Sequence, residues 1–237
     1  MVGGVLASFA ALAMAAAPAG TAARIDPRNP SCPQSPDWGS MKPMQFSFVE
    51  RGGKRILLGE GIVDDGLVAR LKAALETNKP DEIWLRSAGG NARVGNEAGK
   101  IIRQAQIPTR IPAGWACFSA CNFVFMGGWA RFVDPGGLFI VHMFTHTSDR
   151  GAIEAEVLRG TDNTVGLIGD IEQDSAMLAS EDNDFLIRMG VSRKLLTEIM
   201  YRQKAVKEQG GDGSTRRCLT QEEVFQYKVA NVRPEAG

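Results

Sequence analysis

The sequence predicts a single α/β domain, and three observations support that prediction. Short apolar runs alternate with amphipathic stretches, which gives a recurring strand–turn–helix rhythm. The 237 residues, 44% hydrophobic and 23% charged, are enough to bury one core. One long amphipathic helix, expected at residues 165–189, follows these units.

The individual elements follow from periodicity and from turn and cap residues. We expect strands at residues 46–49, 55–58, 82–86, 107–112, 131–133 and 138–143, and helices at about 66–80 and 95–106, through Ser119, at 165–189, at 195–203 and from 221. Gly190 is a good end for the long helix, and Thr220 with Glu223 forms a capping box for the last one. Residues 145–161 and the Gly-rich stretch 208–214 are predicted to be loops.

The first 23 residues differ from the rest, because Arg24 is the first charged side chain of the chain. Small residues at positions 17–19 and 21–23 offer cleavage sites of the A-x-A type, so residues 1–23 are predicted to be a secretory signal peptide. The alternative is an uncleaved anchor, although the run is short and Ala-rich for a membrane span. The domain boundaries predicted are therefore a signal peptide at 1–23, a Pro-rich lead-in at 24–44 and a folded domain at 45–237, with a periplasmic or secreted location and no membrane span after cleavage.

If the protein is exported, its four cysteines are expected to form disulfides, because disulfides persist in oxidising compartments. Three pairings are possible, and the sequence does not choose among them. Cys117 and Cys121 stand four apart, a poor geometry for a bridge if that stretch is regular helix, whereas Cys32 with Cys218 would join the two ends of the domain.

Equal numbers of acidic and basic residues, 27 each, provide no basic field for nucleic acid.

The candidate site lies in residues 113–128, where Ser119 is a single hydroxyl in an otherwise apolar stretch. A buried hydroxyl needs an acceptor, and one of only two histidines, His142, is the obvious one. Acyl transfer requires a nucleophile, a base within hydrogen-bond reach and donors where negative charge develops. Ser119 is therefore the candidate nucleophile and His142 its candidate base.

Three blocks of the sequence resemble the Clp protease proteolytic subunit and its crotonase-like relatives. They are the Ser87-Ala-Gly-Gly90 loop, the small-residue turn that contains Ser119, and Val141-His142-Met143 at the end of a strand. The resemblance covers about residues 46–232, including the final stretch 219–227, and is nearest to an exported bacterial branch of Clp-protease-like proteins. It implies a spiral of strand–strand–helix units with a projecting long helix, and backbone N–H groups of Gly90 and Ala120 as oxyanion donors.

The carboxylate that would orient His142 is ambiguous in this resemblance. Counting back from Leu219 selects Asp212, whereas counting forward from Gly190 selects Ile199, beside Glu198. Asp212 is the preferred candidate, although it stands in a Gly-rich stretch where a solvated turn residue is nearly as good an interpretation. Without a carboxylate the base loses control of its tautomer and much of its rate.

These residues predict an exported serine hydrolase, specifically an ATP-independent peptidase for peptides or unfolded proteins, with no cofactor and no metal. The projecting helix suggests a homo-oligomer. The main alternative is a catalytically degenerate binding or scaffold module of the same fold, and a weaker one is an acyl-ester or thioester enzyme. A zinc site at Cys117, Cys121, His142 and His146 is a further rival, but its ligand pairs are far apart and Met143 follows the first histidine.

Overall fold

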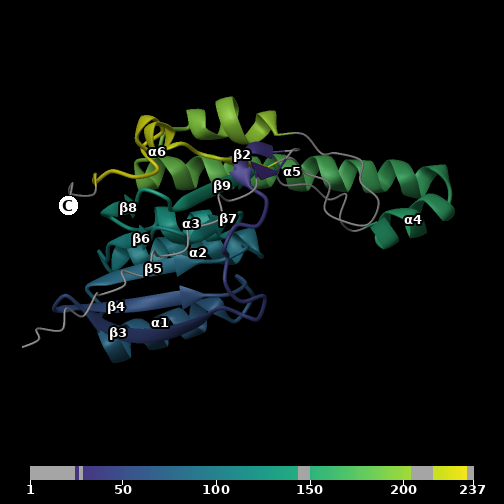
Figure 1. The fold of residues 1–237 in the computed structure, drawn as a ribbon. Helices are drawn as coiled ribbons and strands as arrows, with labels where there is room; N and C mark the ends of the chain where they lie inside the picture. The colour runs from purple at the N-terminus through teal and green to yellow at the C-terminus, as the bar shows by residue number, and fades with distance from the viewer. Residues whose placement is uncertain (1–24, 27–28, 144–149, 204–215, 234–237) are drawn as a thin grey trace, which may run out of the picture.

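The computed structural model describes residues 25–26, 29–143, 150–203 and 216–233, and Figure 1 shows the arrangement of their elements. The predicted signal peptide, His146 and Asp212 lie outside these described residues, so their roles stay predictions. Within the described residues, no helix is both long enough and apolar enough to cross a bilayer.

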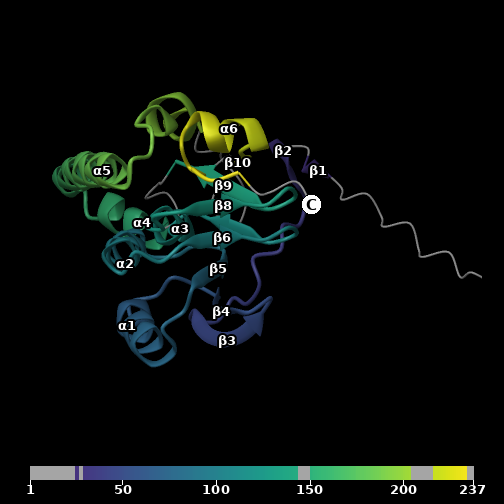
Figure 2. The same cartoon turned by 90° about the vertical axis from the view of Figure 1, so that its left-hand side faces the viewer.

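The main sheet has five strands in the order β3-β4-β5-β6-β8. The strands are β3 (Gln45–Arg51), β4 (Lys54–Glu60), β5 (Glu82–Arg86), β6 (Thr109–Ile111) and β8 (Arg131–Val133). The first two form an antiparallel hairpin around Gly52 and Gly53, which both have positive φ, and the other neighbouring pairs are parallel. The crossover helices α1 (Leu67–Asn78) and α2 (Ala92–Gln104) lie along one side of the stacked strands (Figure 2).

A second sheet of three strands, β10-β9-β7, carries the chain to the candidate site. Strands β7 (Ala116–Phe118) and β9 (Leu138–His142) are parallel, and β10 (Arg216–Cys218) is antiparallel to β9. A disulfide joins Cys218 of β10 to Cys32 of β2 (Asn29–Pro33), a short strand that pairs with β1 (Ile25–Asp26). Of the three possible pairings, the structure therefore has the one that joins the two ends of the domain.

The core is centred on α3 (Cys121–Met126), which is buried along its whole length. Phe123 of this helix meets Phe185 edge to face, with ring centroids 5.3 Å apart, and Phe125 packs against Phe139 of β9. Arg131 is also almost completely buried, and its guanidinium donates to the carbonyls of Gly128, Met189, Lys228 and Val229. A single cation thus holds the C-terminal segment against the core.

The long helix begins earlier than the sequence predicts, and a further helix precedes it. Residues 150–158, expected as loop, form α4 (Arg150–Leu158), and α5 spans Thr161–Met189. The residues of α4 are mostly strong helix formers, and Arg150 pairs with Glu154 one turn on, so local propensity outweighs the polar pattern. Figure 1 shows α5 running well beyond the body with α4 folded beside its outer half.

The remaining elements complete the body around the inner end of α5. Gly190 ends that helix with positive φ, as predicted. The expected helix at 195–203 is instead a π-helical turn, η2 (Leu195–Ile199), followed by a 3-10 turn, η3 (Met200–Arg202). The last helix, α6 (Gln221–Gln226), starts with the predicted capping box of Thr220 and Glu223.

Candidate active site

Ser119 occupies a sharp strand-to-helix turn and not the regular helix that we expected. It follows β7 directly, α3 begins two residues later, and its φ of +55° lies in the left-handed region. A serine held there is strained by about 1–3 kcal/mol, a feature that clusters at functional positions. Cys117 and Cys121 form a disulfide across this turn, with Cα atoms 5.4 Å apart. Poor bridging geometry was expected only for a regular helix, and the chain makes a turn here instead.

The pairing of β7 with β9 brings His142 to Ser119. Phe118 is in register with Ile140, so the serine that follows one strand stands beside the histidine that ends the other. Ser119 Oγ and His142 Nε2 are 2.7 Å apart, within hydrogen-bond distance. The Phe118 ring lies against the imidazole, with centroids 4.6 Å apart, and also packs against Trp38, with centroids 5.8 Å apart. The imidazole is therefore held by packing as well as by the serine.

The Gly89–Gly90 loop after β5 runs immediately beside this turn. A Cβ on Gly89 would stand 2.6 Å from both the Ser119 Cβ and the Phe118 carbonyl oxygen, so only glycine permits the close approach. The loop is fixed by two backbone donors: Gly89 N–H to Ser87 Oγ and Asn91 N–H to the Val63 carbonyl. The Gly89–Gly90 loop is therefore held directly beside Ser119.

The backbone N–H groups of Gly90 and Ala120 are the predicted oxyanion donors. Gly90 has a φ of +141°, and Ala120 directly follows the serine at the start of α3. In the part of the chain that the structure describes, neither N–H donates to another protein group. Both remain available for a substrate oxygen.

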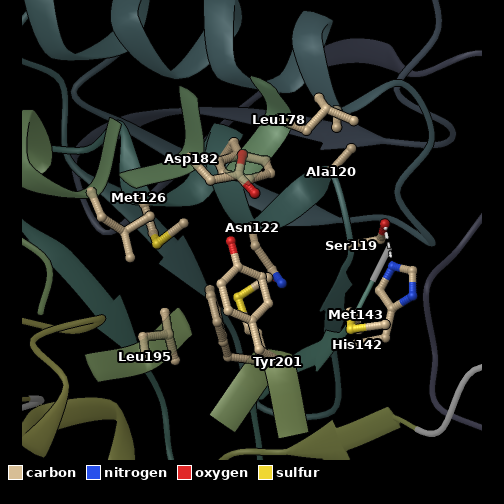
Figure 3. A pocket seen from close by; sticks show the side chains of 15 residues that line it. Ser119, Ala120, Asn122, Met126, His142, Met143, Leu178, Asp182, Leu195 and Tyr201 are labelled. Atoms are coloured by element: carbon tan, nitrogen blue, oxygen red, sulfur yellow. Dashed lines mark hydrogen bonds between the residues drawn. The ribbon is translucent and has the colours of Figure 1, made fainter. Parts of the chain in front are cut away.

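A mostly apolar pocket opens from the Ser119–His142 pair (Figure 3). Side chains from α2, α3, β9, α5, η2 and η3 line it, so both the serine turn and the inner end of the long helix contribute. The residues concerned are Ala92, Ser119, Ala120, Asn122, Phe123, Met126, Phe139, His142, Met143, Leu178, Asp182, Leu186, Leu195, Met200 and Tyr201. Such a concave apolar site next to a polar pair is the usual form of a ligand site.

Two ionisable side chains of this pocket are perturbed by their surroundings. Burial, with a smaller contribution from neighbouring Glu181, raises the pKa of Asp182 to about 7. Burial and the nearby Asp182 carboxylate also raise the pKa of the Tyr201 hydroxyl. Asp182 therefore changes its charge near neutral pH inside an apolar wall.

The two alignments for the third position of the triad lead to Asp212 and to Ile199, which is next to Glu198. Asp212 lies outside the described residues, so its position relative to His142 is not part of the structure. Ile199, reached by the alternative alignment, is buried in the core. Its neighbour Glu198 accepts a hydrogen bond from Tyr227 and pairs with Lys194 at 3.2 Å. Asp212 therefore stays the candidate.

The thiols of the rival zinc pattern are joined to each other in a disulfide, which removes them as thiolate ligands. His146, its fourth member, lies outside the described residues. In the described ranges no group of three His, Cys, Asp or Glu side chains is arranged to hold a metal ion.

Sequence reasoning missed Asp182, Asn122 and Phe118 as residues of the site. A signal for Asp182 was present, because it stands four residues after Leu178 on the apolar stripe of α5. An acidic residue on such a stripe needs a partner or a function. Phe118 and Asn122 are an aromatic and an amide in an apolar run, and nothing in the pattern separates them from core residues.

Solved structures confirm the expected fold. A mutant of ClpP1 from Listeria monocytogenes matches with a TM-score of 0.51 at 14% identity, over 76% of this chain and 91% of that one. A second ClpP1 structure from the same organism matches with a TM-score of 0.50 at 15% identity, over 77% and 92%. A mutant of a membrane-bound stomatin-specific protease matches with a TM-score of 0.46 at 15% identity, over 76% and 78%.

No family model and no curated protein matches the sequence. The two ClpP1 structures nevertheless establish a Clp-protease-like α/β fold for the chain, at very low sequence identity.

Proposed function

We propose that this protein is a serine hydrolase of the peptidase type, with Ser119 as nucleophile and His142 as general base. The observation that carries the proposal is the 2.7 Å approach of Ser119 Oγ to His142 Nε2 at the mouth of an apolar pocket. A nucleophile and base at this separation, on a strained strand-to-helix turn, form the arrangement that acyl transfer requires. The Clp-protease-like fold shared with the two ClpP1 structures adds support.

The chemistry follows from this geometry. Ser119 Oγ bonds to the substrate carbonyl carbon as its proton moves to His142 Nε2, and the carbonyl becomes an oxyanion. The imidazolium then gives that proton to the leaving amine as the C–N bond breaks, and water later cleaves the acyl ester by the same route. The N–H groups of Gly90 and Ala120 stabilise the oxyanion, an effect of about 10²–10³ in rate for one such donor.

Asp212 completes the triad in this proposal. A carboxylate behind the imidazole selects the tautomer that leaves Nε2 free to accept a proton and stabilises the imidazolium. Glu198 does not compete for this role, because it already bonds Tyr227 and Lys194.

We further propose that the protein works outside the cytoplasm, after removal of residues 1–23. The two disulfides agree with an oxidising compartment. Cytoplasmic ATP-driven unfolding is then absent, so the substrates are short peptides or unfolded proteins. The reaction assigned to Ser119 and His142 uses no cofactor.

The arm formed by α4 and the outer part of α5 supports assembly into a homo-oligomer. None of the residues of α4 is buried, and the buried residues of α5 lie only at its inner end. Leu158, Val165 and Ile168 are exposed on this arm, with Leu158 at 87% of its full exposure. Apolar side chains gathered on a projecting element are typical of a subunit contact.

The same arm favours the second candidate function, a scaffold in which the site is catalytically degenerate. That alternative predicts a folded oligomer whose Ser119 is unreactive.

The test is hydrolysis of peptide and ester reporters by the wild type and by Ser119→Ala. We expect the variant to lose at least about 10³-fold in kcat/KM, as removal of a triad nucleophile does. Ser180→Ala is a matched control, because Ser180 is exposed on α5. Equal rates for wild type and Ser119→Ala would contradict the proposal and assign any cleavage to a contaminant. An equal rate loss in the Ser180→Ala control would show that the loss is not specific to Ser119 and would also contradict it.

A further inference from the structure

We propose that Asp182 is a specificity-determining residue, and that the pocket beside Ser119 accepts a long cationic side chain, lysine or arginine, on the acyl side of the scissile bond. This inference rests on the proposed function for its kinetic consequence. The binding preference of the pocket does not depend on catalysis and can be tested separately.

The position of the pocket relates it to the residue whose carbonyl is attacked. Ser119, Ala120 and His142 form one end of it, and Leu178 and Asp182 approach from α5 (Figure 3). A carbonyl carbon at Ser119 Oγ, with its oxygen toward Ala120 N–H, places the adjoining side chain at the pocket mouth. The pocket can therefore bind that side chain and select among substrates by it.

The walls of the pocket suit an aliphatic stem. Met126, Leu186, Leu195 and Met200 line it, and these side chains offer only apolar contact. A lysine or arginine buries three or four methylene groups along such a surface while its charged head seeks acceptors beyond it.

The polar atoms of the pocket include one acceptor that has no donor among the described residues. Asn122 is 3% exposed, and its amide nitrogen donates to the Ile140 carbonyl at 2.8 Å. This contact leaves Oδ1 as a buried acceptor with no hydrogen-bond partner in the described part of the chain. Asp182 adds a carboxyl group, and Figure 3 shows the Tyr201 hydroxyl pointing toward it. A ligand that supplies several N–H donors satisfies what the protein leaves unsatisfied.

The described residues that line the pocket include no lysine or arginine to pair with Asp182, so a cationic ligand can pair with it. Among the described residues, the pocket's one other ionisable group near the serine is His142. Next to Asp182 on α5, Glu181 faces Arg93 of α2 at 3.8 Å, and that arginine also pairs with Asp174. The Tyr201 hydroxyl from η3 is the remaining titratable neighbour.

The charge state of Asp182 makes the preference depend on pH. Burial raises its pKa to about 7, so the carboxyl is largely neutral below that pH and ionised above it. Below pH 7 the pocket then resembles an apolar one and accepts methionine or leucine. Above pH 7 it carries a negative charge that a bound ammonium or guanidinium neutralises.

The kinetic experiment compares two peptide reporters that differ only in lysine or methionine before the scissile bond, from pH 5.5 to 9. We expect the lysine-to-methionine ratio of kcat/KM to rise at least tenfold across this range in the wild type. Asp182→Asn, which keeps the shape, should hold the ratio flat and at least tenfold lower at pH 8.5. Asp184→Asn, the same change on an exposed face of α5, should keep the wild-type ratio.

A binding experiment separates this inference from the proposed function. At pH 8.5 and constant ionic strength, n-pentylamine should raise the Tm of the wild type, Asp184→Asn and Ser119→Ala, but not that of Asp182→Asn. n-Pentanol should affect all four alike. If pentylamine acts in this pattern while no reporter is cleaved, the pocket assignment stands and the hydrolase proposal fails. Equal pentylamine shifts with and without Asp182, or an unchanged lysine-to-methionine ratio in Asp182→Asn, would overturn the inference.

Discussion

The two disulfides lie in regions with different tasks, although all four cysteines are buried. The Cys32–Cys218 bridge joins residues 186 apart and ties β2 to β10. The Cys117–Cys121 bridge joins residues four apart and encloses Ser119. In the chain-entropy model the long bridge is worth about 5 kcal/mol and the short one only about 2 kcal/mol. The long bridge therefore stabilises the fold, and the short one chiefly holds the geometry of one turn.

The largest expected effect is in the region of the short bridge. His142→Gln removes the base but keeps a side chain of similar size, so the rate of peptide hydrolysis should fall by a factor on the order of 10³–10⁶. Thermal unfolding should change little. Steady-state kinetics beside a calorimetric scan measures both, and a loss below tenfold in a folded variant would remove His142 from the mechanism.

The double variant Cys32→Ala with Cys218→Ala should affect the other region. We expect the free energy of unfolding to fall by about 2–5 kcal/mol, because the denatured chain regains the entropy that the long bridge removes. The specific activity of the folded fraction should stay near that of the wild type. Denaturant titration and active-site titration measure the two quantities. A selective loss of kcat at unchanged stability would reverse the assignment of the two bridges.

The matched double variant Cys117→Ala with Cys121→Ala should show the opposite pattern. Without the bridge, the turn can relax the left-handed Ser119 backbone, and a displacement of about 1 Å at a nucleophile can lower kcat by about 10²-fold. Its loss of stability should be at most about 2 kcal/mol. Running this variant beside the Cys32/Cys218 pair sharpens the comparison, since a large stability loss with normal kcat would contradict it.

The smallest expected effect concerns Asp182 and the pH dependence of stability. Its pKa in the folded protein, about 7, is above the ordinary carboxyl value, so the wild type loses stability as the pH rises from about 4 to about 7. Asp182→Asn should match the wild type near pH 4 and be more stable above pH 7. Solvent screening at this partly exposed side chain limits the gain to roughly 1 kcal/mol. Equal Tm differences at pH 4 and pH 8 would show that the carboxyl does not titrate in this range.

The elements that local pattern determines were predictable from the sequence. Strands such as Glu82–Arg86 have a clear apolar run with flanking breakers, and the Thr220 capping box needs only two residues three apart. The Ser119–His142 pair was also predictable, because few residues in this chain could do the chemistry and the spacing resembled a known family.

What failed depended on geometry or on tertiary contacts. The sequence around Ser119 predicts a helix, because its apolar neighbours fit a helix and a turn equally well. A serine, unlike a glycine, does not indicate a left-handed backbone. The Cys117–Cys121 pairing depends on that turn. Helix α4 is different, because its helix-forming residues, among them Ala152, Glu154 and Ala155, are local signals within a stretch that we expected to be loop. The place of Asp182 in the pocket wall depends on the packing of α5 against η3 and the serine turn.

The central claim is that Ser119 is an activated nucleophile, and reaction with a fluorophosphonate probe tests it most directly. The wild type should form one adduct, located by tandem mass spectrometry on the Ser119 hydroxyl, and Ser119→Ala should form none. His142→Gln should label at least about 10²-fold more slowly, because the hydroxyl loses its base. A folded wild-type protein that forms no adduct, or one labelled equally well without His142, would contradict the account.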